Sequence, residues 1–339
     1  MLNIAVVGCG YWGPNLIRNF NGLSSTKVKI ICDKDKNRLK HLQSIYPGIE
    51  TTTKFSDLLS GNDLDAIAIA TPVSEHYKLA IKSIESGKHT MIEKPMSSSV
   101  KECNELIDRA NGRKVTLMVG HTFIYTAVVR KMKKIIEDGD IGDILYISSR
   151  RLNLGLFQKD INVAWDLAPH DLSIILYLIG ESPVAVNCQG KCHVNKGIED
   201  VTSMSLDFRG GKFAIIHNSW LDPNKVREMI IIGSKRMIVY DDNQPLEKIK
   251  IYDKRVETPP HYDTFAEFQY SYHYGDMYSP YIKQEEPLKV ECQHFVDSIT
   301  NGSSPVTSGQ EGLQVVQILE AASKSLKSGG NRVEITTSK

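Results

Sequence analysis

The chain has 339 residues, enough for two domains of ordinary size, and its 41 Lys and Arg residues nearly balance its 40 Asp and Glu residues. This balance gives no net field that would favour nucleic acid or an anionic membrane surface as a partner. No run of about eighteen apolar residues occurs and no basic segment precedes the first apolar run, so we expect neither a transmembrane helix nor a signal peptide. Six scattered cysteines without a C-x-x-C pair indicate reduced thiols in a cytoplasmic protein.

The start of the chain combines a strand, a glycine-rich turn and the beginning of a helix. Residues 2–7 are nearly all apolar, as in a strand buried on both faces of a parallel sheet. They run directly into GCGYWG at 8–13, which has the pattern G-x-G-x-x-G. Gly8 would make the tight turn, Gly10 would let the backbone approach a pyrophosphate, and Gly13 would let helix and strand pack closely. Because phosphates bind at helix N-termini, the stretch predicts a dinucleotide site, and a plain glycine turn is the alternative.

A second strand at 28–32 ends in Asp33. Its distance from Gly8 is close to the spacing of about 20 residues expected for the acidic residue that binds the adenosine ribose. A carboxylate there accepts hydrogen bonds from both ribose hydroxyls and repels a 2′-phosphate, which favours NAD(H). Lys34 and Lys36 keep NADP(H) open as the less favoured cofactor. A solvated aspartate in a turn is the alternative interpretation.

Strands and helices continue to alternate up to residue 121. Further strands are expected at 49–53, 65–70, 89–92 and 115–119, and helices at 37–46, 76–86 and 97–110. This alternation predicts an α/β fold in which a doubly wound parallel sheet forms a Rossmann NAD-binding domain over 1–121. Ligands of such sheets bind at the carboxyl ends of the strands. The residues that the sequence places at those ends are Thr71, Pro72, Glu93, Lys94, Gly120 and His121.

The pattern changes after Gly120. Helices at 128–138 and 166–179 and a strand at 144–150 are followed by strand-like stretches and turn signals from residue 184 onward. These features predict a C-terminal α+β domain over 122–339 with a large, mostly antiparallel sheet. Residues 257–285, rich in Tyr, His and Pro, are expected to form a long loop. Helices expected at 288–299 and 311–328 close the chain.

Three residues are candidates for proton transfer. Lys94 follows a parallel strand and precedes a proline, so it is expected to bind beside the nicotinamide half of the cofactor. Partial desolvation and nearby positive charge there would lower its pKa toward the working range. Asp166 and His170 lie four residues apart on one helix, so the carboxylate can orient and stabilise the imidazole. Pro169 suggests that the helix begins near that point, and Asp171 is an alternative carboxylate. A surface lysine and a histidine packed in a core are the alternatives.

Four further residues are expected near the cofactor. Tyr11 and Trp12 lie in the glycine turn and are expected to pack against the cofactor or the second domain. His76 is expected to cap or pack at the cofactor edge, and Glu93 to orient Lys94 or anchor neighbouring backbone. No cluster of His, Cys and carboxylate side chains has the spacing of metal ligands, so no metal is expected.

Taken together, these residues resemble the Gfo/Idh/MocA oxidoreductase family over essentially the whole chain. The resemblance rests on GCGYWG at 8–13, Asp33, ATP at 70–72 with His76, EKP at 93–95 and DLAPH at 166–170. Within the family, stretches such as GYWGPNLIRNF, RRLNLG, WDLAPHDLSIILYLIG and SWLDPNKVRE are similar to the nucleotide-sugar dehydrogenases of polysaccharide biosynthesis, of the UDP-N-acetylglucosamine 3-dehydrogenase kind.

The resemblance implies that a hydride moves from a ring carbon of a nucleotide-activated sugar, often C3, to nicotinamide C4. His170, oriented by Asp166, would take the hydroxyl proton while Lys94 bonds the same oxygen, although the base differs among such enzymes. Family members often pair the open face of the second sheet with another subunit, so a homodimer or homotetramer is expected. Substrate contacts are expected from His121, Tyr125, Arg151, Asn153 and Trp165.

Three alternatives use the same fold. A 3-ketosugar reductase, or a dehydrogenase of free sugars or inositol-like polyols, would use the same residues for proton transfer. A regulator that binds the dinucleotide without catalysis would not require Lys94, Asp166 and His170 together, which disfavours it. An enzyme that uses NAD for a transient oxidation during glycoside cleavage is not excluded by any sequence feature.

Overall fold

The computed structural model describes residues 1–61, 63–257 and 271–335. The chain divides into two compact units, one of residues 1–126 with 285–320 and the other of residues 127–284 with 321–339. The expected boundary after residue 121 lies close to the first division. Residues 285–320 were expected in the second domain and instead belong with the first unit, because a helix's amphipathic pattern does not identify the domain it packs against.

The first unit is built on a parallel sheet in the order β3-β2-β1-β4-β5-β6. Reading outward from β1, the chain first adds strands on one side and then on the other, which is the doubly wound Rossmann topology. The expected Rossmann sheet is therefore confirmed, and its switch point lies between β1 and β4. The strands are β1 (Leu2–Val7), β2 (Thr26–Cys32), β3 (Glu50–Thr52), β4 (Ala66–Ile69), β5 (His89–Glu93) and β6 (Leu117–Gly120).

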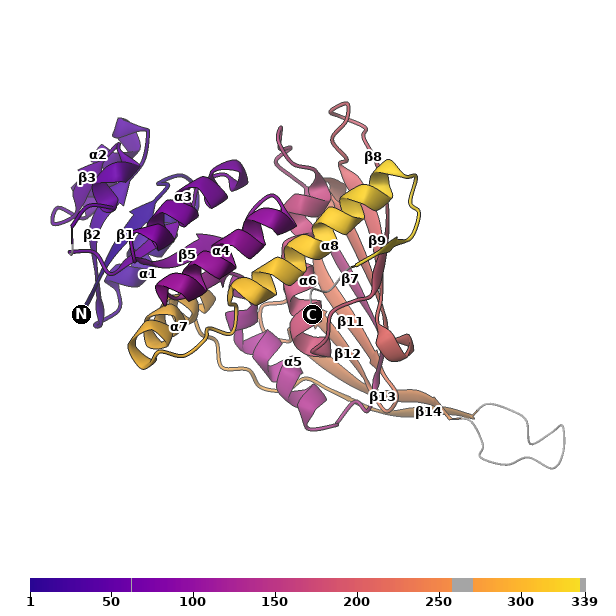
Figure 1. The fold of residues 1–339 in the computed structure, drawn as a ribbon. Helices are drawn as coiled ribbons and strands as arrows, with labels where there is room; N and C mark the ends of the chain where they lie inside the picture. Colours follow the sequence, from indigo (N-terminus) through magenta and orange to yellow (C-terminus); the bar gives the residue numbers. More distant parts are fainter. Residues whose placement is uncertain (62, 258–270, 336–339) are drawn as a thin grey trace, which may run out of the picture. The chain divides into compact units, whose positions relative to one another are not determined.

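Helices cover this sheet, and α3 and α4 run side by side along it (Figure 1). A helix from late in the chain, α7, packs on α1 through Phe20 and Phe295, whose ring centroids are 6.4 Å apart. Arg18 of α1 also bonds Glu286, the residue before α7. The helices are α1 (Gly13–Asn21), α2 (Lys36–Ile45), η1 (Phe55–Leu58), α3 (Val73–Glu85), α4 (Val100–Arg113), η2 (Thr122–Tyr125), α7 (Pro287–Asn301) and the first part of α8 (Gly309–Lys327).

The second unit is built on a sheet in the order β14-β13-β12-β11-β7-β10-β9-β8-β15. All neighbours are antiparallel except β7 and β10, so the expected mostly antiparallel sheet is confirmed. Its strands are β7 (Ile144–Leu154), β8 (Ala185–Lys191), β9 (Val201–Asp207), β10 (Phe213–Ser219), β11 (Leu221–Gly233), β12 (Met237–Asp241), β13 (Ile249–Glu257), β14 (Ser271–Tyr278) and β15 (Val333–Glu334).

The expectation of one long loop over 257–285 was wrong in part. Residues 271–278 form the edge strand β14, which pairs with β13. Most side chains of β14 are exposed, so the strand lacks the alternation of apolar and polar residues that identifies a half-buried strand. Residues 258–270 of the expected loop lie outside the described residues.

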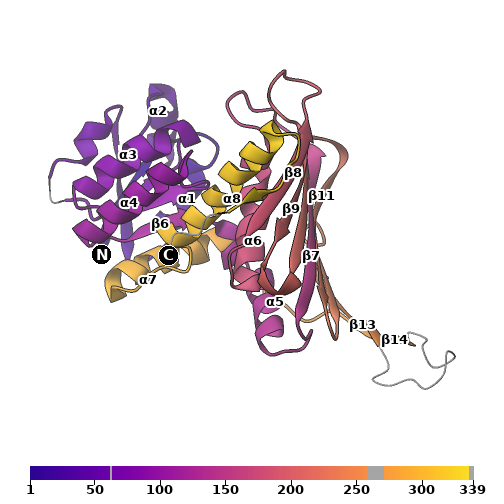
Figure 2. The same cartoon turned by 45° about the vertical axis from the view of Figure 1, so that its right-hand side comes forward.

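Helices α5 (Ala127–Glu137) and α6 (Val163–Ile179) lie on one face of the second sheet (Figure 2), together with the last part of α8; the unit also contains η3 (Arg209–Gly211). Helix α6 begins before the point that Pro169 suggested. The Asn162 side chain caps its first turn by accepting a hydrogen bond from the Trp165 backbone N–H at 3.1 Å. Pro169 therefore lies inside the helix, about two turns after the cap.

The opposite face of this sheet carries no helix from the parts of the chain that the structure describes (Figure 2). Apolar side chains point outward there: Tyr146 of β7 is 40% exposed and Ile215 of β10 is 37% exposed. Their neighbours along the strands, Ile147 and Ile216, are buried on the α6 side. Within the described ranges, no helix has the length and apolar character needed to span a lipid bilayer.

Candidate active site

The glycine turn between β1 and α1 has no room for side chains at two of its three glycines. A Cβ at Gly8, whose φ is +91°, would lie 2.4 Å from the carbonyl oxygen of Ala70. A Cβ at Gly13 would lie 1.8 Å from the carbonyl oxygen of Gly8. At Gly10 the nearest atom would be a guanidinium nitrogen of Arg38 at 3.5 Å, an ordinary contact. The protein itself thus requires Gly8 and Gly13, whereas the open space at Gly10 fits the close approach of a pyrophosphate.

Asp33 is fixed beside this turn by backbone hydrogen bonds. One carboxylate oxygen accepts from the Cys9 N–H at 2.6 Å and the other accepts from the Asp35 N–H at 2.8 Å. Each carboxylate oxygen has a further lone pair, so the group can still accept from ribose hydroxyls. The Arg38 guanidinium lies 3.9 Å from the same carboxylate.

A cavity of about 660 Å³ opens between the glycine turn and the ends of β2 and β4. Its volume is in the range of small-molecule and cofactor sites. Tyr11 and Trp12 line it, and the Tyr11 side chain is 93% exposed. Thr71 and Pro72 also line it, as expected. Arg38, Phe55 and Leu79 also line the cavity and were not expected there, because nothing in their own sequence surroundings shows that they face a ligand.

His76 is buried, and both of its ring nitrogens face backbone carbonyl groups. Nδ1 lies 2.9 Å from the Pro95 oxygen and Nε2 lies 2.8 Å from the Thr71 oxygen. Burial lowers the pKa of His76, and the positive charge of Lys94 lowers it further, while the two carbonyl groups act in the opposite direction. The imidazole thus connects the turn after β4 to the turn after β5, which carries Lys94.

Glu93, at the end of β5, has its carboxyl group packed over Gly120, where an added Cβ would lie 3.0 Å from it. Burial raises the pKa of Glu93 to about 7, although the charge of Lys94 and the indole N–H of Trp12 lower it. A carboxyl group with such a pKa exchanges its proton near neutral pH, directly beside the candidate lysine.

A second buried carboxyl group, Glu291 of α7, lies close enough to Glu93 for their charges to interact. Its Oε2 accepts a hydrogen bond from Thr122 Oγ1 at 2.7 Å. Burial, and then the charge of Glu93, raise the pKa of Glu291 well above its usual range. The two carboxyl groups therefore retain at least one proton between them at neutral pH. Glu291 could not be found from the sequence, because Glu93 is about two hundred residues away in the chain.

His121 and Tyr125 were both expected to contact substrate. His121 is buried, and neither ring nitrogen has a hydrogen-bond partner among the residues that the structure describes. Burial and the charge of Lys94 lower its pKa to about 3, so the imidazole is neutral. The buried Tyr125 hydroxyl instead bonds Thr307 Oγ1 at 2.9 Å, within the packed interior of the first unit.

In the second unit, Asp166 and His170 lie one turn apart on α6, as expected. The Asp166 carboxylate accepts a hydrogen bond from the indole Nε1 of Trp220 at 3.1 Å. The backbone carbonyl of His170 accepts from Ser173 Oγ at 2.9 Å. The sequence analysis did not single out Trp220, although it belongs to the SWLDP stretch.

Asp171 does not serve as an alternative partner for His170. Its carboxylate binds the guanidinium of Arg151 through two hydrogen bonds of 2.9 and 3.0 Å, and both side chains are buried. The Asn218 amide approaches the same carboxylate at 3.5 Å. Arg151, expected to contact substrate, thus has its charge neutralised inside the second unit. The remaining expected substrate residues are half-buried: Asn153 lies in β7, and Trp165 donates from Nε1 to Ser323 Oγ at 2.9 Å.

Replacing Arg151 by Met should lower the free energy of unfolding by about 3–5 kcal/mol, because the Asp171 charge would stay buried without its partner. Chemical denaturation followed by tryptophan fluorescence, to which Trp165 and Trp220 of this unit contribute, measures this change. Adding Asp171→Leu to Arg151→Met should recover most of the loss, since neither charge remains. A single variant as stable as the wild type would show that the ion pair contributes nothing to the fold.

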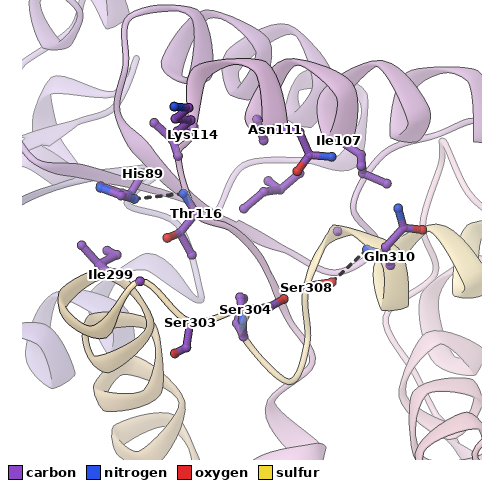
Figure 3. A pocket seen from close by; sticks show the side chains of 16 residues that line it. His89, Ile107, Asn111, Lys114, Thr116, Ile299, Ser303, Ser304, Ser308 and Gln310 are labelled. Atoms are coloured by element: carbon purple, nitrogen blue, oxygen red, sulfur yellow. Dashed lines mark hydrogen bonds between the residues drawn. The ribbon is translucent and has the colours of Figure 1, made fainter.

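A further cavity, of about 410 Å³, lies at the opposite ends of β5 and β6. Figure 3 shows His89 accepting from the Thr116 backbone N–H, at 2.9 Å, and the Ser308 hydroxyl accepting from the Gln310 backbone N–H, at 3.1 Å. These are the amino ends of the strands, whereas ligands of doubly wound sheets bind at the carboxyl ends. The cavity is therefore not the candidate active site.

Comparison with known families decides the identity. The model of the oxidoreductase family with an NAD-binding Rossmann fold, Gfo/Idh/MocA, matches residues 2–121, and the model of the Gfo/Idh/MocA C-terminal domain matches residues 129–239. The chain belongs to the Gfo/Idh/MocA oxidoreductase family. As a member of this family it uses NAD as its cofactor. The glycine turn and Asp33, with the cavity that they line, fit this cofactor.

Relatives of the Gfo/Idh/MocA family match almost the full length of the chain. An uncharacterized oxidoreductase of Bacillus subtilis, YrbE, is 28% identical over 96% of this chain and 94% of its own. Myo-inositol 2-dehydrogenase of Thermotoga maritima is 24% identical, with 96% of each chain covered. The structure of UDP-N-acetylglucosamine 3-dehydrogenase from Acidithiobacillus ferrooxidans superposes with a TM-score of 0.79 at 22% identity, covering 96% and 98%, and thus shares the fold.

The family's EKP and D-x-x-x-H motifs fall in separate units of the structure. EKP at 93–95 ends β5 of the first unit, and Asp166 and His170 belong to α6 of the second. Among the described parts of the chain, no group of three His, Cys, Asp or Glu side chains is arranged to hold a metal ion. Lys94 and His170 are thus the candidate proton-transfer groups that the two motifs carry, one in each unit.

Proposed function

We propose that the protein is an NAD-dependent dehydrogenase that oxidises a ring hydroxyl of a nucleotide-activated sugar, with C3 as the preferred carbon. The observation that carries the oxidation is Lys94, which follows β5 at the carboxyl edge of a sheet whose glycine turn and Asp33 fit NAD. The sugar class is supported by the full-length likeness of fold to UDP-N-acetylglucosamine 3-dehydrogenase and by the shared stretches of sequence.

Different residues would bind the phosphates and the ribose of the cofactor. The open space at Gly10 would take the pyrophosphate at the start of α1, while the tight contacts at Gly8 and Gly13 hold the turn, and Asp33 would accept from the ribose hydroxyls. A 2′-phosphate would meet the same carboxylate, so we infer a preference for NAD over NADP. When bound, NAD supplies the hydride acceptor at C4 of its nicotinamide.

Lys94 and His170 are the proposed proton-handling groups. As the carbon gives up its hydride, the hydroxyl must give up its proton, so that an alcohol and NAD⁺ become a ketone, NADH and a released proton. Lys94 would bond the hydroxyl oxygen and His170, oriented by Asp166, would take part in removing the proton. The near-neutral pKa of Glu93, about 7, supports proton exchange beside Lys94 at working pH.

A free-sugar or polyol dehydrogenase is the second candidate function. It is favoured by the full-length relationship to the myo-inositol 2-dehydrogenase of Thermotoga maritima. The same residues would serve, because the chemistry at the oxidised carbon is identical. The two candidates differ only in whether a nucleotide must accompany the sugar.

A panel assay distinguishes these functions. The purified protein is incubated with NAD⁺ and with UDP-sugars, dTDP-sugars, free sugars and inositols, and NADH is followed by absorbance. An aminotransferase coupled to the reaction removes the keto product where the equilibrium is unfavourable. NADH formed only with nucleotide sugars supports the leading proposal, and turnover only with free sugars or inositols would overturn it. NAD binding without turnover of any compound would favour a non-catalytic regulator.

We also propose that copies of the chain assemble into a homodimer or homotetramer through the open face of the second sheet. The outward apolar side chains of Tyr146 and Ile215 support this, since solvent exposure of an apolar sheet face is unfavourable. Light scattering of the purified protein measures the number of copies.

A further inference from the structure

We infer that Trp220 is a positioning residue for the reaction: its indole N–H holds the Asp166 carboxylate in the orientation that Asp166 needs to act on His170. This inference rests on the proposed function, in which Asp166 orients His170. Nothing in the family comparison assigns a role to Trp220, and the sequence pattern alone did not single it out.

The contact joins a strand end to the first turn of α6. Nε1 of Trp220 lies 3.1 Å from Oδ2 of Asp166, and Trp220 is only 1% exposed. An indole nitrogen can only donate, and a buried Trp normally directs its N–H at an acceptor. A hydrogen bond to a carboxylate is stronger than one between neutral groups, so this bond restrains the side chain of Asp166.

Trp220 can impose an orientation because its own position is fixed on several sides. Its backbone N–H donates to the Asp200 carbonyl at 2.9 Å, and its carbonyl accepts from the Gly155 N–H at 3.0 Å. A Cβ at Gly155 would lie 2.6 Å from Cδ1 of the indole, so only glycine leaves room for the ring. The Phe157 ring packs edge-on against it, with centroids 5.6 Å apart.

Asp166 needs such a restraint because it lies in the first turn of a helix. An aspartate there has rotamers that turn its carboxylate toward the exposed backbone N–H groups of the helix start. Binding Oδ2 to the indole selects one rotamer before substrate arrives. A group that orients a catalytic imidazole works only when it is itself held in place by a further hydrogen bond.

The direct test removes the N–H and keeps the ring. Trp220→Phe retains an aromatic side chain against Phe157 but cannot donate, and kcat should fall about 10- to 100-fold, the loss expected for one hydrogen bond to a charged group. KM should change less than about threefold, because the bond orients a catalytic side chain and contacts no substrate. NAD affinity, which belongs to the first unit, should be unchanged, and a cooperative thermal transition of the variant reports that the second unit is folded.

The matched control is Ser325→Ala, which removes a buried hydrogen bond in the same unit that does not involve Asp166. Ser325 Oγ accepts from the Cys188 N–H at 2.8 Å and is fully buried. Ser325→Ala should lower the melting temperature by an amount similar to that of Trp220→Phe and leave kcat within about twofold of the wild type. If Ser325→Ala lowers kcat as much as Trp220→Phe does, the effect is general destabilisation and the inference is wrong.

A double-mutant cycle with Asp166→Ala separates positioning from structure. If Trp220 acts through Asp166, then Trp220→Phe changes kcat by less than about twofold once Asp166 is already absent. If the two losses multiply instead, Trp220 acts by another route and the inference is overturned. If Asp166→Ala by itself keeps the full kcat, the proposed role of Asp166 in orienting His170 is wrong. That outcome differs from multiplying losses, which would contradict only the role of Trp220.

Should Trp220→Phe fail to fold, benzothienylalanine at position 220 provides the same test. This residue has nearly the shape of tryptophan, with sulfur in place of the N–H. The same loss of kcat is expected, and a fully active protein would overturn the inference.

Discussion

Lys94→Ala should turn over the substrate roughly 100- to 10,000-fold more slowly than the wild type, which is the range for removing a general acid or base. NAD should still bind, because the glycine turn and Asp33, which fit the dinucleotide, do not include Lys94. Steady-state kinetics on the active substrate gives kcat, and titration calorimetry gives the NAD dissociation constant.

The interaction of Lys94 with the buried Glu93 carboxyl group is a second reason to expect a large effect of Lys94→Ala on kcat. The positive charge of Lys94 lowers the pKa of Glu93, so its removal shifts Glu93 further toward the protonated form. A matched variant separates charge from proton transfer. Lys94→Arg keeps a positive charge near Glu93 but does not release its proton in the working range, so it should stay folded and remain almost inactive.

His170→Ala serves as the parallel variant in the second unit and should show a loss of the same order. Full activity of Lys94→Ala or of His170→Ala would contradict the proposed chemistry while leaving the fold and the cofactor assignment intact.

Burying carboxyl groups such as Glu93 and Glu291 makes the free energy of unfolding depend on pH. The folded chain holds the Glu93 proton up to a pH of about 7, whereas an ordinary glutamate releases it near 4.5. Between these values the folded state binds more protons than the unfolded state, so the stability contributed by the protonated form is lost as the pH rises through about 7. A fold without chemistry to perform has little reason to bury two interacting carboxyl groups, one of them next to Lys94, since perturbed groups of this kind cluster at functional sites.

The sequence was most informative where one short segment determines its own environment. Strands buried on both faces show as continuous apolar runs, so β1 and β4 were found together with the glycine turn and Asp33. The end of a parallel strand made Lys94 a candidate, and the i, i+4 spacing on one helix made Asp166 and His170 candidates.

What the sequence could not supply depends on contacts between distant segments. Glu291 approaches Glu93 only because α7 returns to the first unit, and Arg151 meets Asp171 only because β7 packs under α6. Trp220 reaches Asp166 from the end of β10. Each of these residues has an ordinary local pattern, and its role appears only when the fold brings its partner close.

Two single variants of the glycine turn, with Gly48→Ala as a control elsewhere, should separate ligand binding from folding. Gly10→Ala should leave the melting temperature unchanged, because its Cβ meets only the end of the Arg38 side chain at 3.5 Å. It should weaken NAD binding roughly 5- to 150-fold, the cost of about 1–3 kcal/mol for an extra methyl group in a closely packed contact, here with the pyrophosphate. Calorimetric titration and thermal denaturation measure the two quantities on the same sample.

Gly13→Ala should instead damage the fold itself. Its Cβ would lie 1.8 Å from the Gly8 carbonyl oxygen, so the turn must open and both NAD binding and stability should be lost, the latter by about 3 kcal/mol or more. Gly48→Ala is the control, since no atom lies within 4 Å of its Cβ, and it should change neither quantity. If Gly10→Ala binds NAD as tightly as the wild type, the pyrophosphate does not approach this backbone. The protein itself would not explain the glycine at position 10, because the nearest atom, in the Arg38 side chain, lies at an ordinary contact distance and leaves room for a Cβ.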